Sequence, residues 1–383
     1  MVTYMNYKNP IYLDNAASSF PKPQCVINKM HKIMVQNTAN PGRSGHFLSN
    51  ENAKIIYETR KIAAEFFGVG ESPEKVIFTH SATHAINIAI NGLVEEGDTV
   101  IISDMEHNSV LRPLAERAKS GKIQLKIAEV ADNDDETANN FKKLIDKKTK
   151  MVFTTHASNV NGKVLPVKKI GKICKEYNII FCIDASQTAG HLKIDVKDIG
   201  ADILCTAGHK GLFGPQGTGL LIINGDIALK PLIFGGTGGA SLLEIQPDEI
   251  PESLESGTQN TSGIAGLGEG IKFISKYGNK LNKTGKHLYE KAFEAISKIN
   301  GVQIYSSQHN PTHILAFNIR DLPSELITDR LNSKGICVRG GFHCSALFHK
   351  KMKTTEKGIV RASIGGFNTE MQIGSFIRAC KEL

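Results

Sequence analysis

Apolar and polar positions alternate along residues 75–225 in a way that predicts a sheet covered by helices. Short runs rich in Val, Ile, Leu and Phe recur there, separated by longer segments with helical spacing. Continuous apolar runs are typical of strands buried on both faces. The predicted strands are 75–79, 98–103, 151–155, 179–184, 201–206 and 219–225. This alternation predicts a doubly wound, mostly parallel α/β domain.

The chain changes character near residue 235. Two stretches, 235–241 and 255–263, are rich in Gly, Ser and Thr. They are followed by two helical patterns, 264–278 and 285–299, and by a strand pattern at 313–319. Helices and short strands then alternate to the end of the chain, which favours a second, smaller domain of the α+β type. We expect a large domain over residues 13–264 and a small domain formed by 1–12 and 265–383.

Composition is that of an ordinary globular protein. The chain has 383 residues, of which 40% are hydrophobic and 22% charged, enough for a large core. The N-terminus lacks an apolar signal core, and no apolar run approaches the roughly 18 residues that a membrane span needs. We expect a cytoplasmic protein without a membrane partner.

Charge and cysteine content narrow the classes of partner. The formal net charge is +8, but the basic residues are scattered, with short clusters only at 142–150 and 349–353. We interpret them as solvated surface, with a polyanionic partner such as tRNA as the alternative. Seven cysteines form no CxxC pair, disulfide framework or zinc site, so we expect no metal and mostly reduced, buried thiols.

Several predicted strands are followed by polar residues, at the edge where open α/β sheets bind their ligands. Residues 81–83 would begin a helix whose free N–H groups suit an anion, although capping by Ser81 explains the same pattern. His107 follows another strand, where a lone histidine is more often a packed residue than a catalytic one. Each of these features is weak by itself.

Asp184 and Lys210 are more informative, because charges at the ends of buried strands are costly unless they are paired or bound. A buried Asp–Lys ion pair is one explanation. The other is a pyridoxal phosphate (PLP) site, in which the lysine forms a Schiff base, the aspartate pairs with the pyridinium nitrogen and a helix N-terminus holds the phosphate.

Ten short motifs extend in order over nearly the whole chain. They occupy 12–18, 40–46, 80–87, 106–109, 155–166, 184–191, 208–219, 255–261, 339–346 and 360–365. Through them the chain resembles the class V aminotransferase family of fold type I, and especially its cysteine desulfurases and selenocysteine lyases. The resemblance implies a PLP-binding large domain with a mostly parallel sheet and a smaller C-terminal α+β domain.

The resemblance also implies a role for each residue around the PLP ring. Lys210 would carry PLP as a Schiff base, Asp184 would contact the pyridinium nitrogen and Gln187 the ring hydroxyl. His107 would stack on the ring and assist proton transfer. Asn159 would lie near the ring oxygen and the carboxylate of the substrate.

The phosphate would be bound at the predicted helix start. By resemblance, the residues that hold it are Thr83, the backbone of Ala82 and His84, and the neighbouring His209. The family usually has Ser or Thr three residues before the lysine, where this chain has Ala207. Thr206 would point to the opposite side of an extended strand. Thr258 would reach the phosphate of the other subunit of a homodimer, or alternatively cap a helix within one chain.

The reaction implied by the resemblance depends on Arg361 and Cys344. Arg361 would clamp the substrate carboxylate, the alternative being a surface cation. Cys344 follows His343 in a Gly-containing loop with Arg339 nearby, and positive neighbours favour a nucleophilic thiolate. We expect a PLP-dependent L-cysteine desulfurase that forms L-alanine and a Cys344 persulfide and passes the sulfur to an acceptor protein.

Three alternatives remain open from the sequence. They are a selenocysteine lyase, a C–S lyase that acts on a cysteine derivative, and a PLP-fold scaffold protein without turnover. The buried, inert state is expected for Cys174, Cys182, Cys205 and Cys337.

Overall fold

The computed structural model describes residues 10–42, 45–239 and 241–383. The chain divides into two compact units, which we call the large unit and the small unit. The large unit comprises Lys22–His156 and Leu165–Lys276, and the small unit comprises Met1–Pro21, Ala157–Val164 and Tyr277–Leu383. The domain boundaries expected from the sequence remain a prediction.

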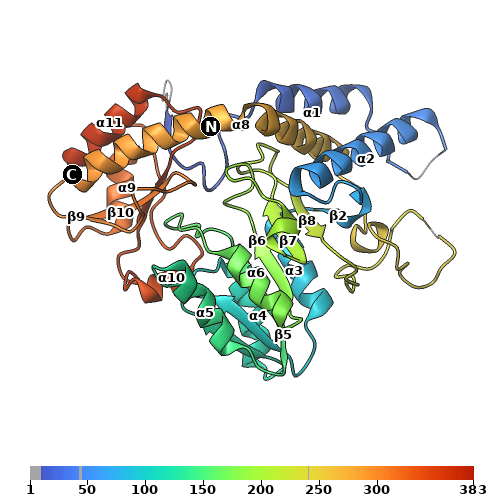
Figure 1. Cartoon of the computed structure of the whole chain (residues 1–383). Helices are drawn as coiled ribbons and strands as arrows, with labels where there is room; N and C mark the ends of the chain where they lie inside the picture. The colour runs from blue at the N-terminus through green and yellow to red at the C-terminus, as the bar shows by residue number, and fades with distance from the viewer. Residues whose placement is uncertain (1–9, 43–44, 240) are drawn as a thin grey trace. The chain divides into compact units, whose positions relative to one another are not determined.

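The large unit is built on a seven-stranded sheet with the order β2-β8-β7-β6-β5-β3-β4. The strands are β2 (Val76–Thr79), β3 (Thr99–Ser103), β4 (Gln124–Ala128), β5 (Thr149–Thr155), β6 (Ile180–Asp184), β7 (Ile203–Ala207) and β8 (Gly219–Ile223). Only β8 runs antiparallel to its neighbours. The predicted mostly parallel α/β fold is therefore confirmed (Figure 1).

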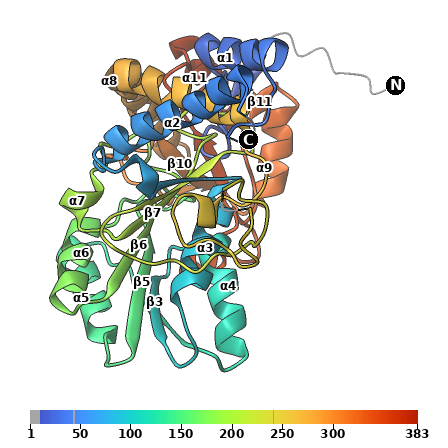
Figure 2. The same ribbon diagram turned by 90° about the vertical axis from the view of Figure 1, so that its right-hand side faces the viewer.

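Sequence patterning missed β4 because this edge strand is partly exposed and carries Lys126 among its apolar residues. The six strands that it did predict are buried over most of their length, as expected for strands between two helical layers. Figure 2 shows α5, α6 and α7 on one face of the sheet and α3 and α4 on the other. The helices are α1 (Gln24–Gln36), α2 (Phe47–Phe67), α3 (Ala82–Leu93), α4 (Asn108–Lys119), α5 (Asp134–Leu144), α6 (Val167–Glu176) and α7 (Val196–Ile199).

One helix, α8 (Thr261–Ser297), replaces the two separate helical patterns of the sequence. Its first residues belong to the large unit and its last to the small unit. Gly278, at which we separated the patterns, lies inside the helix, because a single glycine weakens a helix by only about 1 kcal/mol.

The small unit contains a three-stranded antiparallel sheet, β12-β10-β9, and a short parallel pair, β1-β11. Its elements are β1 (Ile11–Tyr12), β9 (Val302–Ile304), β10 (Ile314–Ile319), α9 (Ser324–Asn332), β11 (Ile336–Cys337), α10 (Ala346–Lys351), β12 (Val360–Ser363) and α11 (Glu370–Lys381). β10 confirms the predicted strand 313–319 to within one residue.

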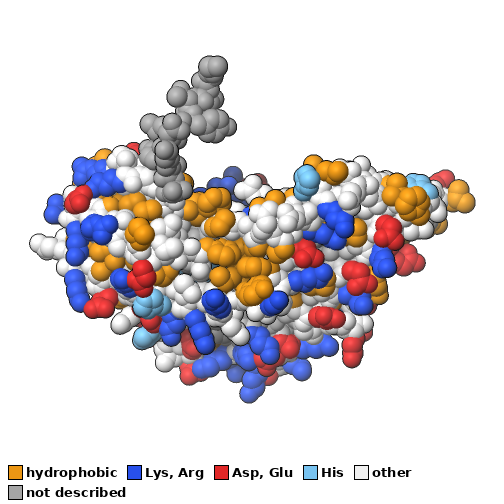
Figure 3. Space-filling view, turned by 90° about the horizontal axis from the view of Figure 1, so that it is seen from above, with side chains coloured by type: hydrophobic (Ala, Val, Ile, Leu, Met, Phe, Trp, Pro, Cys, Tyr) orange, Lys and Arg blue, Asp and Glu red, His pale blue; other side chains and the backbone are white. Residues whose placement is uncertain are grey.

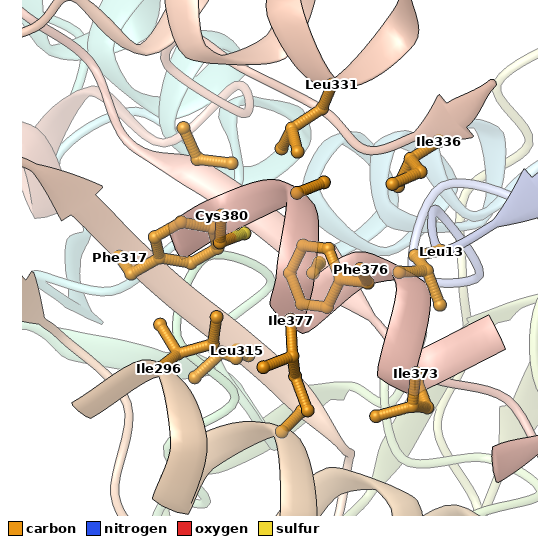
Figure 4. Close-up of a cluster of buried hydrophobic side chains, with 14 of the residues drawn as sticks. Leu13, Ile296, Leu315, Phe317, Leu331, Ile336, Ile373, Phe376, Ile377 and Cys380 are labelled. Atoms are coloured by element: carbon orange, nitrogen blue, oxygen red, sulfur yellow. The ribbon is translucent and has the colours of Figure 1, made fainter. Parts of the chain in front are cut away.

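A hydrophobic core holds the small unit together (Figure 4). Phe317 of β10 and Phe376 of α11 are fully buried, with ring centroids 6.1 Å apart in an edge-to-face arrangement. Leu13, which follows β1, is also fully buried in this cluster. Burial of each such side chain stabilises the fold by about 1.5–3 kcal/mol, so the segment after β1 is firmly attached to the unit.

Candidate functional site

The predicted strand-end residues of the large unit lie at one edge of its sheet. β3, β5, β6 and β7 are parallel, and β2 has the same direction because β8 is antiparallel to both β2 and β7. Asp184 is the last residue of β6, and Lys210 follows the end of β7 by three residues. The sheet thus brings the carboxyl ends of these strands to a common edge, as predicted.

Asp184 is held in a buried setting. Its side chain accepts a 2.9 Å hydrogen bond from the Ser186 N–H, and the residue is 5% exposed. The fully buried Glu106 accepts hydrogen bonds from the Ser103 hydroxyl and the Thr155 N–H. Burial raises the pKa of Glu106 to about 8, and the nearby charge of Asp184 adds to the rise. Glu106 therefore favours its neutral form near pH 7.

Lys210 lies in a turn that close backbone packing fixes. Gly190 has φ +87°, and a Cβ atom there would approach the Gly211 carbonyl oxygen to 2.2 Å, so only glycine fits. The Phe213 N–H donates to the Lys210 carbonyl at 2.9 Å. The Lys22 ammonium donates to the His209 carbonyl at 2.7 Å. The half-buried Lys210 side chain thus projects from a rigid backbone.

Burial and the cations around this turn keep His209 neutral. Burial, then the charges of Lys210 and Lys22, lower the pKa of His209 to about 4. Burial also lowers the pKa of Lys22 to about 8. A neutral imidazole beside two lysines serves as a hydrogen-bond donor to an anion without itself carrying charge.

The N-terminus of α3 has the form of an anion site. Ser81 caps the helix, since its hydroxyl accepts the His84 N–H at 3.2 Å, so this N–H is engaged within the chain. No acidic residue occupies the first turn, and Thr83 is exposed there. Capping by Ser81 is therefore compatible with an anion site, because one cap leaves other N–H groups of the first turn available.

His107 begins α4 and has a fixed ring. Its Nδ1 accepts the Ser109 N–H at 3.1 Å and lies 2.8 Å from the Ser109 hydroxyl. In the neutral ring this places the proton on Nε2. Gln187 is buried in the turn that follows Asp184. Both side chains belong to the same edge of the sheet as Asp184.

Thr258 lies on an anchored segment of the large unit. The buried Arg60 guanidinium pairs with both carboxylate oxygens of Glu255 at 2.7 and 2.8 Å, which fixes the chain three residues earlier. Thr258 itself is exposed. The hydroxyl of Thr258 is not the α8 cap: Asn260 accepts the Gly263 N–H at 3.0 Å.

Arg361 and Asn159 meet in the small unit. Arg361, in β12, is 2% exposed, donates to Asp14 at 2.8 Å and donates to the Asn159 carbonyl at 2.8 Å. Arg361 is therefore no surface cation, and the alternative from the sequence is wrong. Asp14 was missed as its partner, although it lies in the quoted motif 12–18 and directly follows a short apolar strand.

Cys344 is exposed in a strained loop, residues 341–345. Both His343 (φ +47°) and Cys344 (φ +55°) adopt the left-handed conformation that favours glycine. His343 is 3% exposed and donates through Nε2 to the Ile359 carbonyl at 2.8 Å. Burial, then the charge of Arg361, holds the pKa of His343 well below its usual range. The expectation that His343 supplies positive charge to the thiol is therefore wrong.

The other cysteines differ from Cys344, and all seven are free. Burial raises the pKa of the Cys174 thiol to about 12 and shifts those of Cys182 and Cys205 well above their usual value. Cys337 is half-buried, so the expectation of full burial is wrong for it. Cys25 is the other exposed thiol and lies in α1, within the large unit.

Two kinds of feature are absent from the described residues 10–42, 45–239 and 241–383. Within these ranges, no group of three or more His, Cys, Asp and Glu side chains is placed to hold a metal ion. None of the helices in the same ranges is long and apolar enough to cross a membrane.

Comparison with known proteins gives consistent matches. A family model described as aminotransferase class-V matches residues 11–376. A probable cysteine desulfurase of Pyrococcus abyssi is 34% identical over 384 residues, which cover 97% of this chain and 94% of the relative. One from Methanothermobacter thermautotrophicus is 33% identical over 377 residues, with 96% and 92% covered.

A solved structure has the same fold. The apo structure of a cysteine desulfurase from Thermococcus onnurineus NA1 matches with a TM-score of 0.89 and 31% sequence identity. The match covers 97% of this chain and 94% of that chain. This likeness confirms the fold class predicted from the sequence.

Proposed function

Because the chain belongs to the class-V aminotransferase family, we propose that it is a PLP-dependent L-cysteine desulfurase that releases L-alanine and keeps the sulfur as a persulfide on Cys344. Members of this family depend in general on PLP. The observation that carries the proposal is the combination of Lys210 at a charged sheet edge with the exposed Cys344 on a strained loop.

The donor set of the sheet edge fits PLP. Lys210 would hold the cofactor covalently, the buried Asp184 would face its pyridine nitrogen, and the fixed His107 ring would stack on it. Gln187 and Asn159 would bind the ring oxygen. The phosphate would be held by the first turn of α3 through Ala82 and Thr83, together with His209 and, from the partner subunit, Thr258. The His84 N–H, which the resemblance adds to this set, is already engaged by the Ser81 hydroxyl. When bound, PLP supplies an electron sink for the substrate carbon.

The residues of the chain would perform the remaining steps. Arg361 would bind the substrate carboxylate, because its guanidinium is oriented by Asp14 and by the Asn159 carbonyl. The Lys210 amine would take the Cα proton. Cys344 would attack the substrate sulfur as a thiolate, so that an S–S bond forms and the C–S bond breaks. The electron pair stays with the carbon side, which takes up one proton at Cβ and regains a proton at Cα to give L-alanine.

A homodimer is part of the proposal. Exposed apolar side chains concentrate in one segment of the large unit, at Leu232, Ile233, Phe234, Leu242, Leu243 and Ile245. Contiguous exposed apolar surface is typical of protein interfaces. Figure 3 shows basic and acidic side chains interspersed with one another on the face that it displays. This mixing supports solvated surface over a nucleic-acid site.

The other partner would be a sulfur-acceptor protein, because cysteine desulfurases, to which this chain is similar, typically transfer sulfur to acceptor proteins. The exposure of Cys344 supports this, since a persulfide has to be reached by the acceptor thiol. The cytoplasmic location expected from the sequence stays a prediction.

The test of the proposed function is Cys344→Ala. Thiolate leaves poorly from carbon without a sulfur acceptor, so we expect alanine formation from L-cysteine to fall by about 10³-fold or more. In the wild type, mass spectrometry after cysteine treatment should find one additional, reducible sulfur on the Cys344 peptide.

Cys25→Ala, which removes the other exposed thiol, is the matched control and should turn over cysteine normally. Retained cysteine turnover in Cys344→Ala, or sulfur bound only to another cysteine, would contradict the proposal and favour a selenocysteine lyase or C–S lyase. Absence of all turnover in the wild type would favour a scaffold protein.

A further inference from the structure

Asn159 joins two features of the small unit that are distant in sequence. Its side-chain Nδ2 donates to the carbonyl oxygen of His343 at 2.6 Å, across 184 residues of chain. Its own carbonyl oxygen accepts from Arg361 at 2.8 Å. Asn159 is 8% exposed and Arg361 is 2% exposed, so both bonds are shielded from water. Shielded bonds of this kind define orientation well, since water competes poorly for their donors.

The loop that receives the Asn159 bond is strained. Left-handed backbone at two successive residues with side chains, His343 and Cys344, costs free energy and persists only where surrounding contacts hold it. Three further anchors are present. The Gly341 N–H donates to the Ser324 hydroxyl at 3.0 Å, the Ser345 N–H donates to the Phe342 carbonyl at 3.0 Å, and the His343 ring donates to the Ile359 carbonyl.

The Asn159 bond differs from these anchors in what it holds. The others fix the two ends of the loop and the imidazole ring. The carbonyl that Asn159 binds belongs to the peptide group between His343 and Cys344, and this group includes the Cys344 nitrogen. The orientation of that peptide plane constrains φ of Cys344 and hence the direction of its Cα–Cβ bond, from which the thiol projects.

We propose that Asn159 is a positioning residue for the nucleophile, which holds the peptide plane before Cys344 and thereby aims the thiol. Asp14 and Arg361 support it by fixing the Asn159 backbone. The inference rests on the proposed function, in which Cys344 attacks sulfur. It is separate from any contact of Asn159 with cofactor or substrate, because it concerns the loop backbone.

The chain offers a matched control in Asn161. This residue is also 8% exposed, and its Nδ2 donates to the backbone carbonyl of Tyr305 at 3.0 Å. Asn161→Ala therefore removes the same kind of buried amide donor two residues away without touching the Cys344 loop. Two variants of Asn159 are compared. Asn159→Ala removes both the amide donor and the side-chain volume, whereas Asn159→Leu removes the donor but keeps the volume.

Two readouts on the holoenzyme test the loop without relying on turnover. Hydrogen–deuterium exchange of the peptide spanning 339–346 reports the Ser345 amide, and iodoacetamide alkylation reports Cys344. In both Asn159 variants we expect the exchange rate to rise roughly fivefold, because about one hydrogen bond is lost. The alkylation rate should change by a similar factor. Asn161→Ala should match the wild type in both.

The outcomes separate the inference from the proposed function. The inference would be overturned if both Asn159 variants exchanged and were alkylated at the wild-type rates. A fall in cysteine turnover would then have to come from a contact of Asn159 with the cofactor or the substrate. An altered loop in Asn159→Ala with a normal loop in Asn159→Leu would assign the effect to packing and would also overturn it. Failure of the wild type to form a persulfide would contradict the proposed function, while both loop readouts would remain interpretable.

Discussion

The sheet edge of the large unit and the Cys344 loop of the small unit carry their reactive groups on very different backbones. Lys210 and Asp184 follow buried strands, and glycine takes the left-handed position nearby at Gly190. In the loop, His343 and Cys344 themselves are left-handed. Groups that hold a cofactor benefit from rigidity, whereas a thiol that moves sulfur between two partners benefits from an exposed loop.

The electrostatics of the two places differ as well. At the sheet edge burial favours the neutral forms of Glu106 and His209, which lie there with Lys210 and Lys22. Near the Cys344 loop the buried Arg361 is paired with Asp14, Arg339 is half-buried, and burial keeps the imidazole next to the thiol neutral. The sheet edge is thus suited to bind an ionic cofactor, and the loop is suited to present a thiol.

The strongest way to separate the two regions is Lys210→Ala. We expect alanine formation to fall by about 10³-fold or more, because the proton transfer assigned to Lys210 is lost. Borohydride should attach PLP to the Lys210 peptide in the wild type and leave the variant unlabelled. Cys344 should be alkylated at the wild-type rate in the variant. Labelling of another lysine would refute the assignment, and slowed alkylation would show that the two regions are not independent.

The Arg361–Asp14 pair can be weakened by Asp14→Asn. A hydrogen bond to a charged group contributes about 1.5–3 kcal/mol, so poorer orientation of Arg361 should raise KM for L-cysteine by roughly tenfold to a hundredfold. Steady-state kinetics would measure this. Asp321→Asn is the control, because Asp321 pairs with Lys357 at an exposed site where ion pairs contribute about 0–1 kcal/mol. Equal effects of the two variants would contradict the role of Asp14.

The sequence predicted the sheet edge better than the loop for a physical reason. Asp184 and Lys210 were identifiable from a local pattern, because Asp184 ends one continuous apolar run and Lys210 follows another within three residues. Asp14 and Asn159 act through bonds to residues 347 and 184 positions away, which no local pattern reports. The neutrality of His343 likewise depends on burial by the folded chain, so the sequence suggested a cation there.

The same distinction applies to the fold. Seven buried strands were predicted to within two residues, whereas the buried four-residue β12, the partly exposed β4 and the short β1, β9 and β11 were missed. A strand of two or three residues has too few positions for a period to emerge.

The reach of Thr258 to a partner subunit is tested by subunit mixing. Thr258→Ala should weaken PLP retention roughly fivefold, the equivalent of about one hydrogen bond. Mixing it with Lys210→Ala subunits should restore one complete site per heterodimer, measured by PLP content and alanine formation. Ser262→Ala, which removes a nearby hydroxyl in the first turn of α8, is the control and should retain PLP as the wild type does. A fully active monomer in sedimentation would contradict the shared site.

The smallest expected effect concerns the end of β7, where the chain departs from its family. Ala207 is 4% exposed and occupies the position of a usual hydroxyl ligand, so Ala207→Ser should strengthen PLP retention roughly fivefold through one new hydrogen bond to the phosphate.

The neighbouring Thr206 is fully buried, and the described residues offer its hydroxyl no hydrogen-bond partner. Thr206→Val should therefore leave PLP retention unchanged and maintain or raise the melting temperature, because a buried unsatisfied hydroxyl is replaced by a methyl group. Loss of PLP from Thr206→Val would instead make Thr206 the phosphate ligand and remove the reason for Ala207→Ser to act.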